Sequence, residues 1–505
     1  MADLLSILFS FQPDAPELKS NLEYDRQVRN FLSTLAQVPP NAFIKGADTG
    51  QDLLEILNPT VNTIAYLYAL LYRIQSYGDH PKSIKSIPDG FRPQGPLWRK
   101  LVEFLETFDP VQVRYVGGDW RRVVEYAERV ARVVGMPGVA IAPIRSAMIR
   151  LDPSTGTFTS THLLFIRLCL EARAYVAALP ILDNYIHSLP SHIPRAVQEQ
   201  ESSLPCADLT NSSDYVTTRS GHTEKITISD VQEYYLLGAM AYLGVRKYKQ
   251  ALHFLEHILV SPAANIASGF MLEAYKKWIL VTYLVDGAVL AIPRTANPSA
   301  IKQVRAASKA YEALADAFKN MEHRKLHAQV DVGAPIWAED GNHGLVKELV
   351  DHSQRVYVSN LQRTYSAIPV LDVANMLNQT PDQAEAYLQS LIDGRYLNAR
   401  IGRIASPTEV AVLRFFPDLT QGPLAKTEKQ QYIELMEQTE RTNLLAEQVK
   451  AADYRLSLTK EYLEHLRRQN RKSTPNNAGG EAMDMTWDDG VDQEEDIMAD
   501  DEPRR

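Results

Sequence analysis

The stretch that decides the fold lies near the C-terminal end and reads IPVLDVANMLNQTPDQAEAYLQSLIDGRYLNARIGRIASPTEVAVLRFF, residues 368–416. Its first part predicts a short helix, because apolar residues recur there three positions apart. Thr380 is a good N-cap residue and Pro381 suits the first helical position, so a second helix should run from Pro381 to Asp393. Gly394 is expected to end this helix in the left-handed conformation.

A β-hairpin should follow the second helix. Two runs in which apolar residues partly alternate, residues 396–404 and 410–416, are joined by the turn-forming stretch ASPTE. Two helices followed by a hairpin make a winged helix-turn-helix, which we predict for residues 369–422.

The chain before the winged helix reads as helix almost throughout, in segments that end at Pro or Gly. A tetratricopeptide pattern fits residues 234–262 through Leu237-Gly238 and Phe254, although Ala251 is one residue out of register. Ordinary antiparallel helix hairpins are the alternative. Either interpretation gives an α-solenoid of stacked hairpins, because a single hairpin cannot bury its apolar face alone.

A long charged helix should follow the winged helix. Its apolar positions alternate spacings of four and three residues, which is typical of a helix that packs along another helix. These positions are Leu445, Val449, Ala452, Leu456, Thr459, Leu463 and Leu466. This seam either packs back on the body of the chain or joins helices of other chains.

The predicted fold is therefore mainly α, with a solenoid of tetratricopeptide-like hairpins, a winged helix and a long C-terminal helix. The predicted domains are N-terminal helical repeats at 1–150, tetratricopeptide-like repeats at 151–368 with a polar insert at 190–230, the winged helix at 369–422, the C-terminal helix at 427–471 and a disordered acidic tail at 473–505.

The composition is that of a globular protein, with 45% apolar and 23% charged residues in a chain of 505. Cys169 and Cys206 are too few for a disulfide framework or a four-cysteine zinc site, which favours a reducing, intracellular location. The formal net charge is −9, and residues 473–505 alone hold eleven acids and two arginines, so the remainder is neutral. A neutral body gives no electrostatic reason to bind nucleic acid or an anionic membrane.

A winged helix invites a DNA-binding function, in which the second helix enters the major groove. Here that helix carries Asp382, Glu385 and Asp393 and no basic residue, and carboxylates repel the phosphate backbone. Docking to other proteins through its faces and its exposed strand edge is therefore favoured over nucleic-acid binding.

The sharpest catalytic pattern is HFLEH at residues 253–257, which fits the inverted zinc-protease motif H-x-x-E-H. His253 and His257 would share one helix face and could hold zinc, with Glu256 as general base. The Phe-Leu pair within the motif instead fits the apolar contacts of a repeat helix, so an ordinary helix surface is favoured. Phosphate-loop, dinucleotide, nucleophile-elbow and C-x-x-C motifs are missing from the sequence. We therefore predict no catalytic residue, no metal and no cofactor.

Residues 368–401 resemble the hallmark of the PCI domain, a family shared by subunits of the proteasome lid, the COP-nine signalosome and a translation initiation factor. Four further stretches resemble a signalosome member of that family, and MLEAYKKWILV is the most specific of them. They are residues 158–183, 234–262, 271–287 and 341–365.

The resemblance implies a non-catalytic scaffold subunit of the signalosome, which removes the ubiquitin-like protein Nedd8 from cullin-RING ubiquitin ligases through a zinc isopeptidase in another subunit. The partners would be other PCI subunits, the isopeptidase-type subunits and, indirectly, cullin-RING ligases, with no small-molecule substrate and no membrane. The expected location is the cytoplasm and the nucleus. A subunit of the proteasome lid or of an initiation factor, a nucleic-acid-associated PCI protein and a zinc hydrolase are the alternatives.

The resemblance further implies that the winged helix joins those of other subunits and that the C-terminal helix enters a shared helical bundle. The residues expected at these interfaces are apolar positions of the two elements. They are Leu371, Leu377, Leu388, Ile401, Val410, Val412, Leu445, Val449, Leu456, Leu463 and Leu466.

Overall fold

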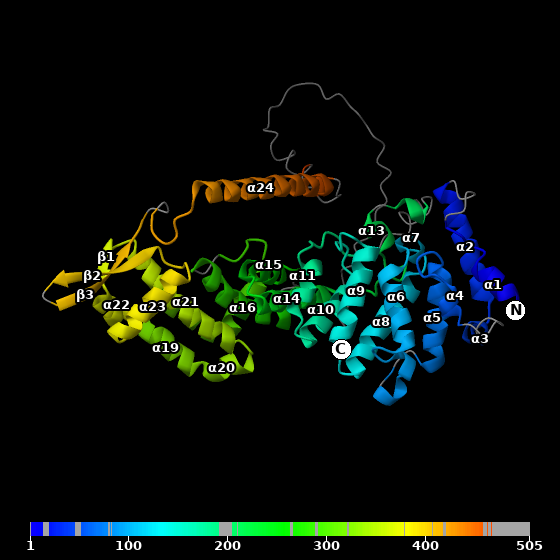
Figure 1. Ribbon diagram of the computed structural model, residues 1–505, viewed down its shortest axis with the longest axis horizontal. Helices are drawn as coiled ribbons and strands as arrows, with labels where there is room; N and C mark the ends of the chain where they lie inside the picture. Colours follow the sequence, from blue (N-terminus) through cyan, green and yellow to red (C-terminus); the bar gives the residue numbers. More distant parts are fainter. Residues whose placement is uncertain are drawn as a thin grey trace, which may run out of the picture. The chain divides into compact units, whose positions relative to one another are not determined.

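The computed structural model in Figure 1 shows a chain that is mainly helical. It describes residues 2–13, 20–45, 52–78, 81, 83–190, 205–209, 211–262, 266–287, 291–320, 323–377, 379–406, 408–417, 421–457, 462 and 466. The chain forms two compact units: residues 1–396 with 401–414, and residues 397–400 with 415–505. The tail predicted to be disordered, residues 473–505, lies outside the described residues.

The first unit opens with helices that pack around aromatic side chains. They are α1 (Ala2–Leu8), α2 (Asn21–Gln37), α3 (Pro40–Lys45), α4 (Leu53–Ile56), α5 (Thr63–Tyr77), α6 (Pro96–Thr107), α7 (Pro110–Val113), α8 (Gly117–Val133) and α9 (Gly138–Leu151), with short 3-10 helices at Ile84–Ser86 and Asp89–Phe91. The rings of Tyr66 and Phe104, from α5 and α6, stack with centroids 5.8 Å apart. Apolar residues all around α5 fit its burial on most sides.

Helix hairpins continue the array. The elements are α10 (Ser160–Glu171), α11 (Tyr175–Leu182), α13 (Ser212–Tyr215), α14 (Ile228–Gly244), α15 (Tyr248–Leu259) and α16 (Gly269–Asp286), with a 3-10 helix at Cys206–Asp208. Gly238 explains the close crossing of α14 and α15, because a Cβ there would lie 2.6 Å from a ring carbon of Phe254. The predicted Gly and Phe positions of the repeat therefore meet in space, and the hairpin prediction for this stretch is confirmed.

The described part of the polar insert is irregular, as the sequence predicts, but it is not a solvated loop. Tyr215 is buried and its hydroxyl donates to the backbone oxygen of Leu151 at 3.0 Å. Arg114 lies over the Tyr215 ring, 4.1 Å from its centroid. The buried His222 packs so tightly against Gly117 that any Cβ at this glycine would clash with the imidazole ring. The sequence did not predict this packing, because most side chains of the segment are polar and only a few, such as Tyr215 and His222, are buried.

The last helices of the array are α17 (Pro298–Ala307), α18 (Lys309–Lys319), α19 (His323–Val332), α20 (Ala334–Glu339) and α21 (His343–Leu361). A polar network joins α16 and α18 to the residues after α20. Lys276 Nζ donates to Asp340 Oδ1 at 2.7 Å, and the Tyr311 hydroxyl donates to Asp340 Oδ2 at 2.8 Å. The hydrogen bonds to the Asp340 carboxylate lower its pKa in spite of partial burial.

A winged helix follows, with β1 (Ala367–Pro369), α22 (Val370–Leu377), α23 (Pro381–Asp393), β2 (Ala399–Ser406) and β3 (Thr408–Phe415) in the sheet order β1-β3-β2. The predicted cap is confirmed, because the Thr380 side chain accepts from the backbone N–H of Gln383 and Pro381 starts the helix. The sequence analysis missed β1, which pairs antiparallel with β3 and places Ile368 opposite Leu413.

The left-handed stop predicted at Gly394 is wrong. Gly394 has a φ of −72°, and the left-handed residue is Arg395, with a φ of 58°. A Cβ at Gly394 would lie 3.0 Å from the Tyr396 ring, so the glycine permits close packing rather than a left-handed turn.

The second unit contains α24 (Glu428–Ser457) and the chain that leads into it. Asn398 holds this entry segment together, since its Nδ2 donates to the backbone oxygens of Phe416 at 3.1 Å and Gln421 at 3.0 Å. Its Oδ1 accepts from the Leu424 N–H at 3.3 Å. The sequence predicts a helix up to residue 471, and most of residues 458–471 lie outside the described part.

Candidate protein-interaction surfaces

α24 exposes many apolar side chains. Those that are between 46% and 67% exposed are Tyr432, Ile433, Leu435, Met436, Leu444, Leu445, Val449, Tyr454 and Leu456. Soluble proteins rarely leave extended apolar surface in water, and such surface marks contact sites. Helices often dock against other proteins through exposed apolar side chains.

Four residues of the predicted C-terminal seam, Leu445, Val449, Ala452 and Leu456, lie on one side of α24. Leu445, Val449 and Leu456 are exposed, at 47%, 66% and 51%. Leu466 is half-buried, and Leu463 lies outside the described residues.

The residues predicted on the winged helix differ in exposure. Leu371 and Val410 are exposed, at 54% and 37%. The other partly accessible positions, Leu377, Ile401 and Val412, are half-buried. Leu388 is fully buried. It therefore serves the chain's own core, and we leave it out of the proposed interface.

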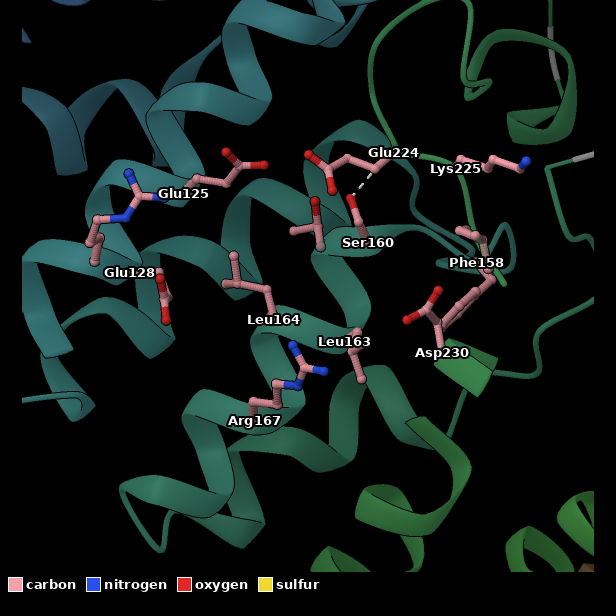
Figure 2. A pocket seen from close by; sticks show the side chains of 13 residues that line it. Glu125, Glu128, Phe158, Ser160, Leu163, Leu164, Arg167, Glu224, Lys225 and Asp230 are labelled. Atoms are coloured by element: carbon pink, nitrogen blue, oxygen red, sulfur yellow. Dashed lines mark hydrogen bonds between the residues drawn. The ribbon is translucent and has the colours of Figure 1, made fainter. Parts of the chain in front are cut away.

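A hollow of about 340 Å³ lies between α8, α10 and the segment before α14 (Figure 2). Arg167 forms a two-pronged ion pair with Glu233, with both nitrogens 2.7 Å from carboxylate oxygens. Arg121 Nη1 donates to Glu224 at 2.6 Å, and the Glu224 N–H donates to Ser160 Oγ at 3.4 Å. These polar groups hydrogen-bond to one another across the helices. We therefore interpret the hollow as part of the packing between helices and not as a ligand site.

The HFLEH motif lies on α15 (Tyr248–Leu259), and its polar side chains contact one another and their neighbours. His253 and His257 share a hydrogen bond, with their Nε2 atoms 3.2 Å apart. The Tyr235 ring stacks on His257, and burial together with the neighbouring His253 lowers the pKa of His257 to about 4. Glu256 accepts from Trp278 Nε1 at 3.5 Å, so the motif's general base is engaged by an indole.

The two cysteines lack the features of reactive thiols. Cys169 is buried, and desolvation raises the pKa of its thiol to about 12. Burial also raises the pKa of Cys206. In the part of the chain that the structure describes, no three His, Cys, Asp or Glu side chains are grouped to hold a metal ion. Within the same residues, no helix is long and apolar enough to cross a bilayer.

The described elements define a class of protein: a helical-repeat array followed by a winged helix and a long helix with exposed apolar side chains. Residues 27–300 match the family described as "COP9 signalosome complex subunit 3, N-terminal helical repeats". This chain belongs to the family of COP9 signalosome complex subunit 3.

Relatives that match over most of their length agree with this assignment. The COP9 signalosome complex subunit 3 of Emericella nidulans is 30% identical over 509 residues, which cover 99% of this chain and 100% of the relative. That of Neurospora crassa is 26% identical over 521 residues and covers 98% of each chain. That of Drosophila melanogaster is 22% identical over 355 residues, which are 70% of this chain and 73% of the relative.

The sequence analysis missed the apolar side chains in the first half of α24. Tyr432, Ile433 and Met436 are exposed and line one shallow hollow. Met436 follows Tyr432 by four residues and Ile433 by three, and these spacings place it beside both on the helix surface, which is a signal readable from the sequence.

Proposed function

We propose that this chain is a non-catalytic scaffold subunit of the COP9 signalosome, and that α24 and the winged helix attach it to other subunits. The observation that carries the proposal is the exposed apolar surface of α24. Burying a leucine or valine side chain stabilises an interface by roughly 1.5–3 kcal/mol. A helix with this many exposed apolar side chains is therefore a strong contact element once partner helices cover it.

The proposal assigns the chemistry of the complex to another subunit. The complex would remove Nedd8 from cullin-RING ligases with a zinc isopeptidase, and this chain would organise that assembly. Support comes from the engaged HFLEH residues, the two thiols of raised pKa and the relatives, which are named as complex subunits.

The test replaces Val449→Asp and Leu456→Asp in the tagged full-length chain expressed in its native cells. Two charges on the seam should cost roughly 3–6 kcal/mol of apolar burial at the interface, so the variant should no longer co-purify with other subunits. Quantitative mass spectrometry of the eluate and a cullin-deneddylation assay measure the loss. Helicity by circular dichroism should not change, because both side chains are exposed in the single chain.

The matched control is Gln431→Asp with Gln438→Asp, which adds the same charge to polar positions of the same helix. The control should retain its partners and its deneddylase activity. The proposal fails if the Val449 and Leu456 variant still co-purifies at normal stoichiometry, or if the wild-type eluate holds proteasome or ribosomal proteins instead.

A further inference from the structure

Two histidines on α15 approach each other at the surface of the helical array. His253 and His257 are one helical turn apart, so they share one face of the helix. The other side of α15 is buried through Phe254, Leu255 and Ile258. His253 is exposed and His257 is half-buried, so the pair is accessible from solvent while its helix is held in the array.

The two imidazole rings converge through their nitrogens. The Nε2 atoms of His253 and His257 are 3.2 Å apart, whereas the ring centroids are 4.5 Å apart and the rings are inclined by 70°. The nitrogens therefore lie nearer to each other than the ring centres do. A hydrogen bond between two imidazole nitrogens requires one of them to be unprotonated, so one lone pair already points at the other ring.

This spacing suits a metal ion held by both nitrogens. Zinc binds imidazole nitrogens at about 2.0–2.1 Å, so two nitrogens 3.2 Å apart subtend an angle of roughly 100–105° at the ion, near the tetrahedral value. The ion replaces the proton between the rings. With both rings neutral, that proton leaves to solvent and Nδ1 of the same ring takes one up, so no net proton is released.

Aromatic neighbours position both rings. The Tyr235 ring of α14 stacks on His257, with centroids 4.7 Å apart and an interplanar angle of 23°. The Tyr185 ring meets His253 edge-on, with centroids 6.4 Å apart and an interplanar angle of 85°. Ligands that are held in place before the metal binds lose less conformational entropy, which favours affinity.

The third polar residue of the motif is not available as a general base. Glu256 accepts a hydrogen bond from Nε1 of the buried Trp278 at 3.5 Å. Over the described ranges, no further His, Cys, Asp or Glu side chain joins the pair to make a group of three, so water would complete the coordination. Imidazole suits late first-row ions such as Zn²⁺, Ni²⁺ and Cu²⁺. The arrangement therefore fits metal binding and not metal-dependent hydrolysis.

We propose that His253 and His257 bind one Zn²⁺ ion reversibly at the surface of α15, without catalysis. The sequence analysis predicts no metal, because the Phe-Leu pair inside HFLEH fits the apolar contacts of a repeat helix. In the structure both features coexist, since Phe254 and Leu255 are buried while the histidine nitrogens converge on the other side. The inference is independent of the proposed scaffold function.

The experiment is isothermal titration calorimetry of Zn²⁺ into the full-length chain, freed of metal with a chelator and kept at neutral pH. The wild type should bind a Zn²⁺ ion that His253→Gln and His257→Gln bind at least about tenfold more weakly, because loss of even an outer-shell partner of a metal-binding histidine costs about 10–100-fold in affinity. His253→Gln should keep its fold, since this side chain is exposed, and circular dichroism checks it.

Two control variants separate this site from other histidines. His343→Gln removes an exposed histidine that has no second histidine four residues away. His327→Gln tests the other pair with the same spacing, His323 and His327. Both variants should keep the site that His253→Gln loses. The inference is overturned if the wild type shows no saturable binding, or if its tightest site is unchanged in His253→Gln. Either result leaves the proposed scaffold function unaffected.

Discussion

His162 shows how one side chain can link stability to pH. It is buried at the start of α10, where its Nε2 lies 3.2 Å from the backbone oxygen of Thr155. Its Nδ1 lies 3.2 Å from the Thr159 N–H and 2.8 Å from the Thr159 hydroxyl. This pattern suits a neutral imidazole with its proton on Nε2, and burial lowers the pKa of His162 to about 4.

The unfolded chain should therefore bind a proton at His162 near pH 6.5, well before the folded chain does. Between these two pKa values the unfolded state holds more protons, so acidification lowers the free energy of unfolding. By pH 5 the loss should be roughly 1–2 kcal/mol from this residue. Denaturant unfolding at pH 7 and pH 5 measures it.

The control for this prediction is His162→Gln, which cannot titrate. It should reduce the difference in stability between pH 7 and pH 5, although it is destabilised at both. An unchanged difference would mean that His162 is not responsible. His222, whose pKa burial also lowers to about 4, should give the same result in its own Gln variant.

At the scale of elements, Asn398 fixes the chain that enters α24. Three backbone groups after β3 hydrogen-bond to its side chain, which is 5% exposed. Asn398→Ala removes all three bonds, each worth about 0.5–1.5 kcal/mol. Hydrogen exchange at the Leu424 amide should then become faster by at least about tenfold, which corresponds to 1.4 kcal/mol.

Asn443→Ala is the matched control, since it removes an exposed asparagine from α24 itself. Exchange at Leu424 should not change in that variant. Equal exchange in the Asn398 variant and the wild type would show that the asparagine does not order this segment.

How far the elements were predictable depends on how local their signals are. Thr380 and Pro381 predict the start of α23 correctly, because an N-cap residue and a proline at the first helical position affect only the first turn of the helix. β1 is three residues long, too short to show alternation, and its pairing with β3 depends on residues more than forty positions away. Gly394 was the expected left-handed residue, but Arg395 adopts that conformation. The Tyr396 ring packs closely against Gly394, and this contact cannot be read from the local sequence.

At the scale of the whole molecule, one buried cluster of side chains runs from Leu4 to Leu349 through the helical array. Stacked hairpins explain why repeated apolar spacing predicted this architecture without any single strong motif. The candidate interface was only partly predictable. The seam from Leu445 follows from its spacing, whereas the burial of Leu388 depends on how α22, α23 and the sheet pack together.

The sequence left open whether the C-terminal helix packs on its own chain or on other chains, and a truncation separates these possibilities. A chain that ends at Ala425 lacks α24 and should keep the thermal unfolding midpoint of the full chain, because the exposed side chains of α24 add little to the folded monomer. The same truncation should abolish co-purification with other subunits. A clear fall in the midpoint by calorimetry would mean instead that α24 stabilises its own chain, since burial of even two leucines would contribute roughly 3–6 kcal/mol.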